Sequence, residues 1–128
     1  MLHLIRTGMA IVGIVGLVAA GPAAAAHPRG AVTRGMCSAE SHWHLKLVQR
    51  EHVIGVRFLV VTGVDGDIWR VGLAHNRRVI FRGRRVTGDP DGSFMVRMLT
   101  RNLDGLDVFR AGAWNRETGE FCRARLAI

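Results

Sequence analysis

The sequence contains no tyrosine, a single lysine and few aromatic residues, which make up 6% of the chain. Proteins that bind single-stranded nucleic acid commonly stack the bases on aromatic side chains. Because tyrosine is absent and the setting of Phe81 predicts a core position, such a stacking platform is missing. Nucleic acid is therefore the least favoured partner, although the formal net charge is +8.

The sequence also lacks the motifs of common enzymes and calcium sites. Ser38, Ser41 and Ser93 all lie outside a G-x-S-x-G setting, which marks the nucleophile of many hydrolases. The acidic turns at 65–67 and 89–92 supply neither the oxygen ligands nor the downstream glutamate of a calcium loop. We therefore predict a non-enzymatic protein with no cofactor.

Cysteine is scarce as well, and Cys37 and Cys122 are the two that are present. Two cysteines allow one intramolecular pairing, which would join the start of the predicted domain to its end. A disulfide across so long a loop stabilises a fold by about 4–5 kcal/mol in the chain-entropy model. Such a bond persists in an oxidising compartment, so the pair favours an exported protein without a thiolate nucleophile.

Residues 1–26 have the order of a secretory signal peptide. Arg6 precedes an uncharged apolar run at 9–20, and alanines fill 23–26, which predicts cleavage after Ala26. The alternative is an uncleaved anchor, but the apolar run is shorter than the ~20 residues that span a bilayer. We expect a secreted protein with no transmembrane span after cleavage.

The mature chain divides into a leader at 27–36, which shows no periodicity and is expected to be flexible, and a domain at 37–128. Within the domain, apolar and polar residues alternate in short runs separated by turn residues, which is the pattern of half-buried strands. These runs are 43–47, 53–61, 68–75, 79–86, 93–101, 107–115 and 121–128. No run has the 3.6-residue period of a helix.

Seven short strands in one small domain predict an all-β fold, an antiparallel β-sandwich closed by one disulfide. We favour an immunoglobulin-like form, with Trp69 on the third strand as its central core tryptophan. The cysteines bracket the domain and do not join its second and sixth strands, so the pattern differs from that of a true immunoglobulin domain.

Two motifs carry a resemblance to a group of known proteins. The chain starts its domain with Cys-Ser-Ala-Glu-Ser-His-Trp at 37–43 and ends it with Asn-Arg-Glu-Thr-Gly-Glu-Phe-Cys-Arg at 115–123. It resembles small secreted single-disulfide proteins of high-GC Gram-positive bacteria. The resemblance spans residues 37–128 and implies a secreted β domain, with no activity or ligand attached.

The candidate binding residues are mainly arginines, and no acidic residue lies between Asp67 and Asp89. Guanidinium groups suit phosphate and carboxylate ligands, so a ribbon of arginines predicts attraction to anionic cell-wall polymers or to an extracellular protein. The alternative is a solvated strand face. Trp114 shares a face with Arg110 and is a candidate for stacking a sugar ring or for packing. The predicted set is Arg77, Arg78, Arg82, Arg84, Arg85, Arg110 and Trp114.

The histidines suggest a second function. Cleavage after Ala26 would make His27 the amino terminus, with its amine and imidazole together. His42 and His44 lie two residues apart on a predicted strand and therefore on one side of it. Amine and imidazole ligands suit Cu(II), so copper binding through these histidines is the alternative to a polymer-binding role.

Overall fold

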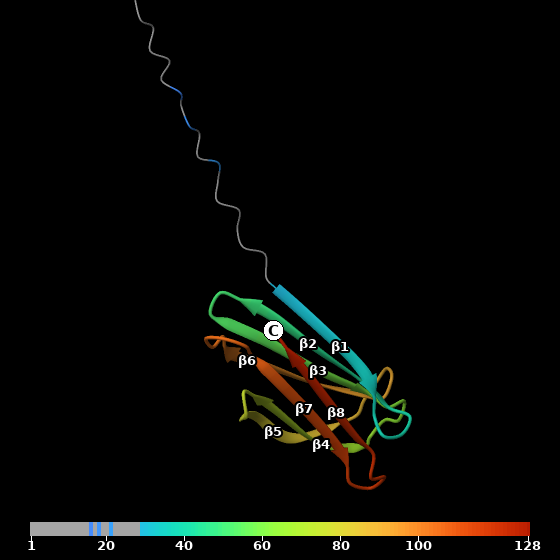
Figure 1. Ribbon diagram of the computed structural model, residues 1–128. Coiled ribbons are helices and arrows are strands. Elements are labelled where there is room, and N and C mark those ends of the chain that lie inside the picture. The colour runs from blue at the N-terminus through green and yellow to red at the C-terminus, as the bar shows by residue number, and fades with distance from the viewer. Residues whose placement is uncertain (1–15, 17, 19–20, 22–28) are drawn as a thin grey trace, which may run out of the picture.

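The computed structural model describes residues 16, 18, 21 and 29–128, and residues 29–128 form an all-β sandwich (Figure 1). Almost all of the predicted signal peptide and residues 27–28 lie outside the described residues. The strands are β1 (Arg29–Met36), β2 (His42–Arg50), β3 (Val53–Val61), β4 (Ile68–His75), β5 (Arg78–Val86), β6 (Ser93–Arg101), β7 (Val108–Asn115) and β8 (Phe121–Ala127). In the described part, no helix has the length and apolarity that a bilayer crossing requires.

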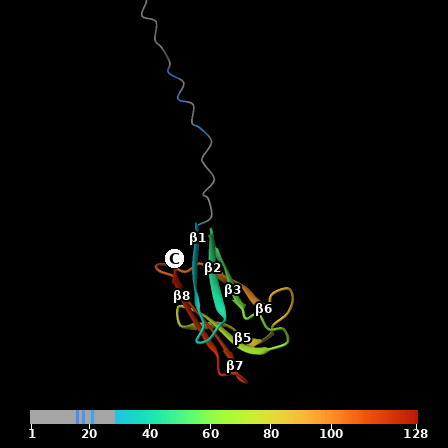
Figure 2. The same cartoon turned by 90° about the vertical axis from the view of Figure 1, so that its right-hand side faces the viewer.

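The strands form two antiparallel four-stranded sheets, which pack face to face as two layers (Figure 2). One sheet has the order β1-β2-β3-β6 and the other β5-β4-β7-β8, so the chain changes layers after β3, β5 and β6. Successive strands reverse direction, so every connection lies at one of two ends. The predicted antiparallel β-sandwich is confirmed, with eight strands where the sequence indicated seven.

The additional strand is β1, which corrects the prediction of a flexible leader for Arg29–Met36. This segment pairs along its whole length with β2, from Arg29 opposite Gln49 to Met36 opposite His42. Its burial alternates, but the half-buried positions are Ala31, Thr33 and Gly35, and none of them is fully buried. The larger apolar side chains Val32 and Met36 are on the exposed side. Because the inner face of this edge strand has no large apolar residue, its sequence lacked the alternation that indicates a strand.

Alternate side chains of the central strands point between the sheets, as the period-2 pattern predicted. Trp43 and Trp69 belong to this core, with 8% and 1% of their surface exposed. The Trp43 ring lies over Gly35 of β1, where a Cβ would come within 2.5 Å of it, so glycine is required there. The remaining large core side chains are Leu45, Leu47, Ile54, Val56, Phe58, Val60, Val71, Leu73, Phe94, Val96 and Phe109.

The Cys37–Cys122 disulfide is formed, as predicted, and it fastens one end of the sandwich. Cys37 follows β1 and Cys122 lies in β8, so the bond connects the two sheets. We call this the disulfide end. Four connections lie there, at 37–41, 62–67, 87–92 and 116–120.

The two sequence motifs at 37–43 and 115–123 meet at the disulfide end. The Glu120 carboxylate accepts hydrogen bonds from Ser41 Oγ at 2.7 Å and from the Ser41 amide at 3.0 Å. The Phe121 amide donates to Ser38 Oγ at 2.9 Å, and the Ser38 amide donates to the Phe121 carbonyl at 2.8 Å. These residues therefore have a structural role, which is to close the sandwich around the disulfide.

The runs predicted at 68–75 and 79–86 form the β4–β5 hairpin, which turns through Asn76 and Arg77, and both residues have positive φ, at 46° and 71°. A two-residue turn with this backbone favours Asn-Gly, because a left-handed conformation costs a non-glycine side chain about 1–2 kcal/mol. We expect Arg77→Gly to raise the free energy of unfolding by about 1 kcal/mol, measured by chemical denaturation. Arg78→Gly, one residue on and within β5, is the control; a gain there and none at Arg77 would contradict this assignment.

Candidate functional site

Charge is segregated in this fold between the strands and their connections. Every one of the ten acidic residues lies in a connection, and seven of them lie at the disulfide end. The charged residues within the strands are all arginine or lysine: Arg29, Arg34, Lys46, Arg50, Arg57, Arg70, Arg78, Arg82, Arg84, Arg85, Arg97, Arg101, Arg110, Arg123 and Arg125. Within residues 29–128 the one contact between a basic and an acidic side chain joins His75 to Asp107, so none of the strand arginines is neutralised by a contacting carboxylate.

Six of these arginines share the outer face of the β5-β4-β7-β8 sheet, which we call the arginine face. Directly opposed residues of an antiparallel sheet point to the same side, so the strand register defines this face. Arg70 of β4 is opposite Arg84 of β5 on one side and Trp114 of β7 on the other. The arginine face comprises Arg70, Arg82, Arg84, Arg110, Arg123 and Arg125, all exposed.

The structure unites four of the predicted residues on this face and separates three others. Arg82, Arg84, Arg110 and Trp114 lie on the arginine face. Arg85 is opposite the buried Trp69 and points to the inner side, where its guanidinium lies 4.7 Å from the centre of the Phe81 ring. The two remaining residues, Arg77 and Arg78, lie at the β4–β5 turn.

The sequence prediction missed Arg70, Arg123 and Arg125, which alternation along β4 and β8 already placed opposite the apolar positions. It also missed Phe121, which is 46% exposed and lies directly opposite Trp114, itself 45% exposed. The face thus carries an exposed aromatic pair. This finding corrects the argument that no stacking platform exists.

A hollow lies at the centre of the arginine face, over two glycines. Gly72 and Gly112 are directly opposed on the neighbouring central strands β4 and β7. The hollow has a volume of about 340 Å³, and Arg82, Arg110 and Arg123 contribute to its lining. Its floor is the backbone of the two glycines together with small and aliphatic residues, among them Ala74 and Val79. The lining is almost entirely apolar, and the three arginines stand at its edge.

The outer face of the β1-β2-β3-β6 sheet is also basic, and we call it the second basic face. Arg57 is opposite Lys46 on one side and Arg97 on the other. The guanidinium Nε atoms of Arg57 and Arg97 both lie 3.1 Å from the Met95 sulfur. Unlike the arginine face, this face has no exposed aromatic pair among the described residues. It carries exposed apolar side chains, which are Val32, Met36 and Leu99.

Two of the three predicted copper ligands lie on this second basic face. His42 and His44 point to the same side of β2, as predicted, with ring centres 5.7 Å apart. Partial burial, the adjacent Arg34 and His42 lower the pKa of His44, so its imidazole is neutral at pH 7. His27 lies outside the described residues. Within the described part, no group of three or more histidine, cysteine or acidic residues is placed to hold a metal ion.

The acidic turns at the disulfide end contact each other. The pKa of Asp65 is raised, chiefly by a hydrogen bond with the Asp89 side chain and then by desolvation and the negative charge of Asp89. A raised carboxyl pKa means that the folded state binds the proton more tightly, so stability falls as pH rises from about 4 through the raised value.

We therefore expect Asp65→Asn to raise the thermal midpoint at pH 7 and to have no effect at pH 3, where Asp65 is protonated in both states. Thermal melts at the two pH values measure this difference. Asp67→Asn, in the same connection, is the control. An equal gain at both pH values would contradict an electrostatic origin.

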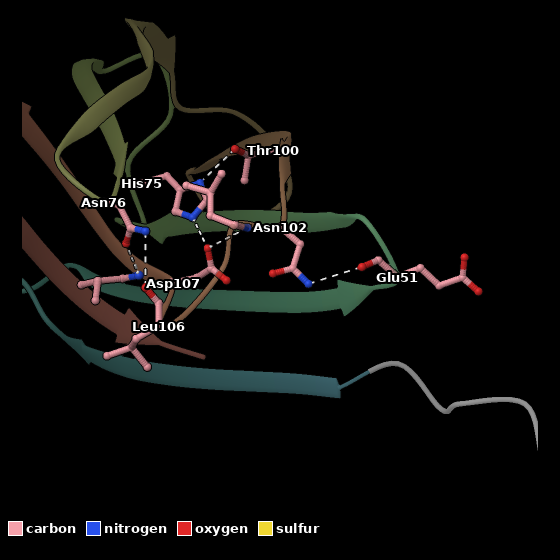
Figure 3. A network of polar contacts seen from close by, with 9 residues as sticks. Glu51, His75, Asn76, Thr100, Asn102, Leu106 and Asp107 are labelled. Atoms are coloured by element: carbon pink, nitrogen blue, oxygen red, sulfur yellow. Dashed lines mark hydrogen bonds and ion pairs between the residues drawn. The ribbon is translucent and has the colours of Figure 1, made fainter.

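A buried polar network fastens the end of the sandwich opposite the disulfide (Figure 3). His75 of β4 donates from Nε2 to Asp107 Oδ1 at 2.6 Å, and its Nδ1 lies 3.0 Å from the Thr100 hydroxyl of β6. His75 also stacks on Phe109 at 4.3 Å, and Asp107 pairs through its backbone with Ile128. This network therefore connects both sheets and the last residue of the chain.

Comparisons with protein-family models, with curated proteins and with solved structures gave no significant match. The fold and the site together define a disulfide-closed β-sandwich protein with two basic outer faces. Each face carries a hollow, of about 520 Å³ on the second basic face and about 340 Å³ on the arginine face, and the arginine face also carries an exposed aromatic pair.

Proposed function

We propose that this protein is a secreted, non-enzymatic binding module that holds an anionic polymer of the cell envelope on its arginine face. The observation that carries the proposal is the set of six exposed arginines on one sheet face, without an acidic residue among them and without a contacting carboxylate. A fixed cationic surface of this kind has a strong attraction for polyanions and weak attraction for neutral polymers. An extracellular protein with a matching acidic surface is the other partner that such a face suits.

The β-sheet supports this role because it holds the backbone positions of the arginines at regular spacings. Neighbouring strands are about 4.8 Å apart, and alternate residues along a strand are about 6.8 Å apart. The arginines of β5 and β8 therefore stand at opposite edges of the sheet, with those of β4 and β7 between them. A linear polymer lying across the strands contacts several positive charges at once. Because these contacts are linked through the polymer, the overall affinity is higher than that of any single contact.

The proposal is tested by measuring the binding of polygalacturonate, an acidic polysaccharide, with neutral dextran as the control polymer. We expect the triple variant Arg82→Gln, Arg110→Gln, Arg123→Gln to bind polygalacturonate at least tenfold more weakly than the native protein at low salt. The matched triple variant on the second basic face is Lys46→Gln, Arg57→Gln, Arg97→Gln, which removes the same charge. Equal losses in the two variants, or equal binding of dextran, would contradict a specific arginine face.

The compartment and the fold type belong to the same proposal. We infer an exported protein, which the disulfide supports, and an immunoglobulin-like sandwich. The order of the last seven strands supports the second inference, because β2-β3-β6 packs on β5-β4-β7-β8 as strands A-B-E pack on C′-C-F-G in such domains. Trp69, 1% exposed on β4, has the place of the core tryptophan on strand C.

A second candidate function is copper binding, which the adjacent imidazoles of His42 and His44 favour. Neutral imidazole is the form that binds Cu(II), and the lowered pKa of His44 keeps it in that form. Titration of the secreted protein with Cu(II), followed by visible absorbance, tests this candidate. Loss of the absorbance in a His42→Ala, His44→Ala variant is the expected result, and no spectral change in the native protein would exclude it.

A further inference from the structure

The backbone conformation does not require glycine at either position of the glycine pair in the centre of the arginine face. Neither Gly72 nor Gly112 has a positive φ, and a Cβ at either position would meet its nearest atom at 3.9 or 3.8 Å, an ordinary van der Waals contact. Central strands normally favour β-branched residues, and glycine weakens them. Glycine in a strand interior often marks a place where a ligand approaches the backbone closely. The two glycines therefore point to a ligand on this face.

The hollow above these glycines has the size of a small binding site and an apolar lining, with three arginines at its edge. Gly72 and Gly112 lie in a row that begins with Arg82 on β5 and ends with Arg123 on β8. Three strand intervals separate the two arginines, so their backbones are about 14 Å apart with only the two glycines between them in the row. Arg110 stands in the next row. The hollow is open to solvent, and its volume of about 340 Å³ is that of a small binding site.

The next row of the sheet supplies a surface for the uncharged part of the ligand. Trp114 and Phe121 are directly opposed there, half exposed, and Arg70 follows Trp114 in the same row. The guanidinium of Arg123 lies 5.2 Å from the centre of the Phe121 ring, so the aromatic pair and the hollow adjoin. Flat aromatic surfaces stack the C–H face of a sugar ring, and guanidinium groups bind carboxylates.

We propose that the hollow holds one acidic sugar of a linear polysaccharide and that Trp114 stacks a neighbouring sugar ring. The sugar's carboxylate is bound by Arg82, Arg110 and Arg123, and its ring lies on the floor of Gly72 and Gly112. This inference rests on the proposed function. It adds the chemical class of the polymer and the position on the arginine face at which the polymer binds. A simple polyphosphate would bind the arginines but would make no stacking contact with the aromatic pair.

The floor is tested by the variant Gly72→Thr, Gly112→Thr, which fills the hollow with side chains that suit a strand. Because the backbone leaves room for a Cβ, we expect an unchanged or higher thermal midpoint together with at least tenfold weaker binding of polygalacturonate. Gly55→Thr is the matched control, because Gly55 lies on the second basic face and a Cβ there would also meet its nearest atoms at 3.8 Å. Native affinity in the glycine variant, or a loss in Gly55→Thr instead, would overturn the site.

The aromatic platform is tested separately with three probes: polygalacturonate, inorganic polyphosphate and single-stranded oligo(dT). We expect Trp114→Ala to weaken polygalacturonate binding about tenfold and to leave polyphosphate binding unchanged, while Trp114→Phe restores most of the affinity. Equal losses for all three probes, or tighter binding of oligo(dT) than of polygalacturonate, would overturn the choice of an acidic glycan.

The two proposals fail in different ways. If the triple arginine variant binds polygalacturonate weakly and the Gly72→Thr, Gly112→Thr variant binds it normally, the arginine face is the binding surface but the hollow is not the site. If the native protein binds none of the three polyanions, the proposed function itself is wrong and the hollow has no ligand of this class.

Discussion

Removal of the disulfide should lower the free energy of unfolding by about 4–5 kcal/mol. The bond closes a loop with a sequence separation of 85 residues, so its loss releases a large conformational entropy in the unfolded chain. It also removes the covalent connection between the sheets at the disulfide end. Whole small domains are often stable by only about 5–15 kcal/mol, so about a third of the margin or more depends on this bond. Urea unfolding of the native protein and of Cys37→Ala, Cys122→Ala measures the difference.

The hydrogen bonds at the same end provide a control for the entropic explanation. Ser41→Ala removes the 2.7 Å bond to Glu120 and leaves the disulfide in place, so it should cost only about 1 kcal/mol. An unfolding midpoint that is the same with and without reductant would contradict the role given to the disulfide.

At the opposite end, Asp107→Ala should lower the free energy of unfolding by about 3–5 kcal/mol. Asp107 is 1% exposed, and its Oδ1 accepts bonds from His75 Nε2 at 2.6 Å and from the Leu103 amide at 3.3 Å. Truncation leaves the buried His75 donor and the part-buried Leu103 amide without an acceptor, which costs more than the lost bonds themselves. Chemical denaturation of the purified variant measures the loss.

Two further substitutions separate the buried pair from the rest of its network. Thr100→Val removes only a neutral hydroxyl partner of His75, so it should cost about 1 kcal/mol. Asp107→Asn keeps an acceptor for both donors and removes the charge, so its cost should fall between the other two. An alanine variant as stable as the native protein would show that the pair does not fasten this end.

Most of the fold could be predicted from the sequence because its strands alternate strictly. Trp69, Val71 and Leu73 are buried and Arg70 between them is exposed, a pattern that needs no tertiary information. The β4–β5 hairpin and the single disulfide followed from a two-residue connection and from two cysteines. The first strand could not be predicted in this way, because β1 is defined by its hydrogen bonds to β2 and its half-buried positions hold only Ala31, Thr33 and Gly35.

The site was predictable only in part, since a sheet face is assembled from strands that are distant in sequence. Clustering along the chain selected Arg85, whose side chain is on the inner side, and omitted Arg123, which the register places beside Gly112. The hollow could not be found either, because it depends on two glycines 40 positions apart that become neighbours in the sheet. The buried pair of His75 and Asp107 shows the same limit, since its partners are 32 residues apart.

The most direct test of the central claim is the salt dependence of polygalacturonate binding. Each guanidinium that contacts an anionic group displaces a counterion, so the logarithm of the affinity falls linearly with the logarithm of the salt concentration. The slope should be steep for the native protein and shallower by about two for Arg82→Gln, Arg110→Gln, Arg123→Gln. A native affinity that does not change with salt, or a slope that the triple variant leaves unaltered, would contradict binding on the arginine face.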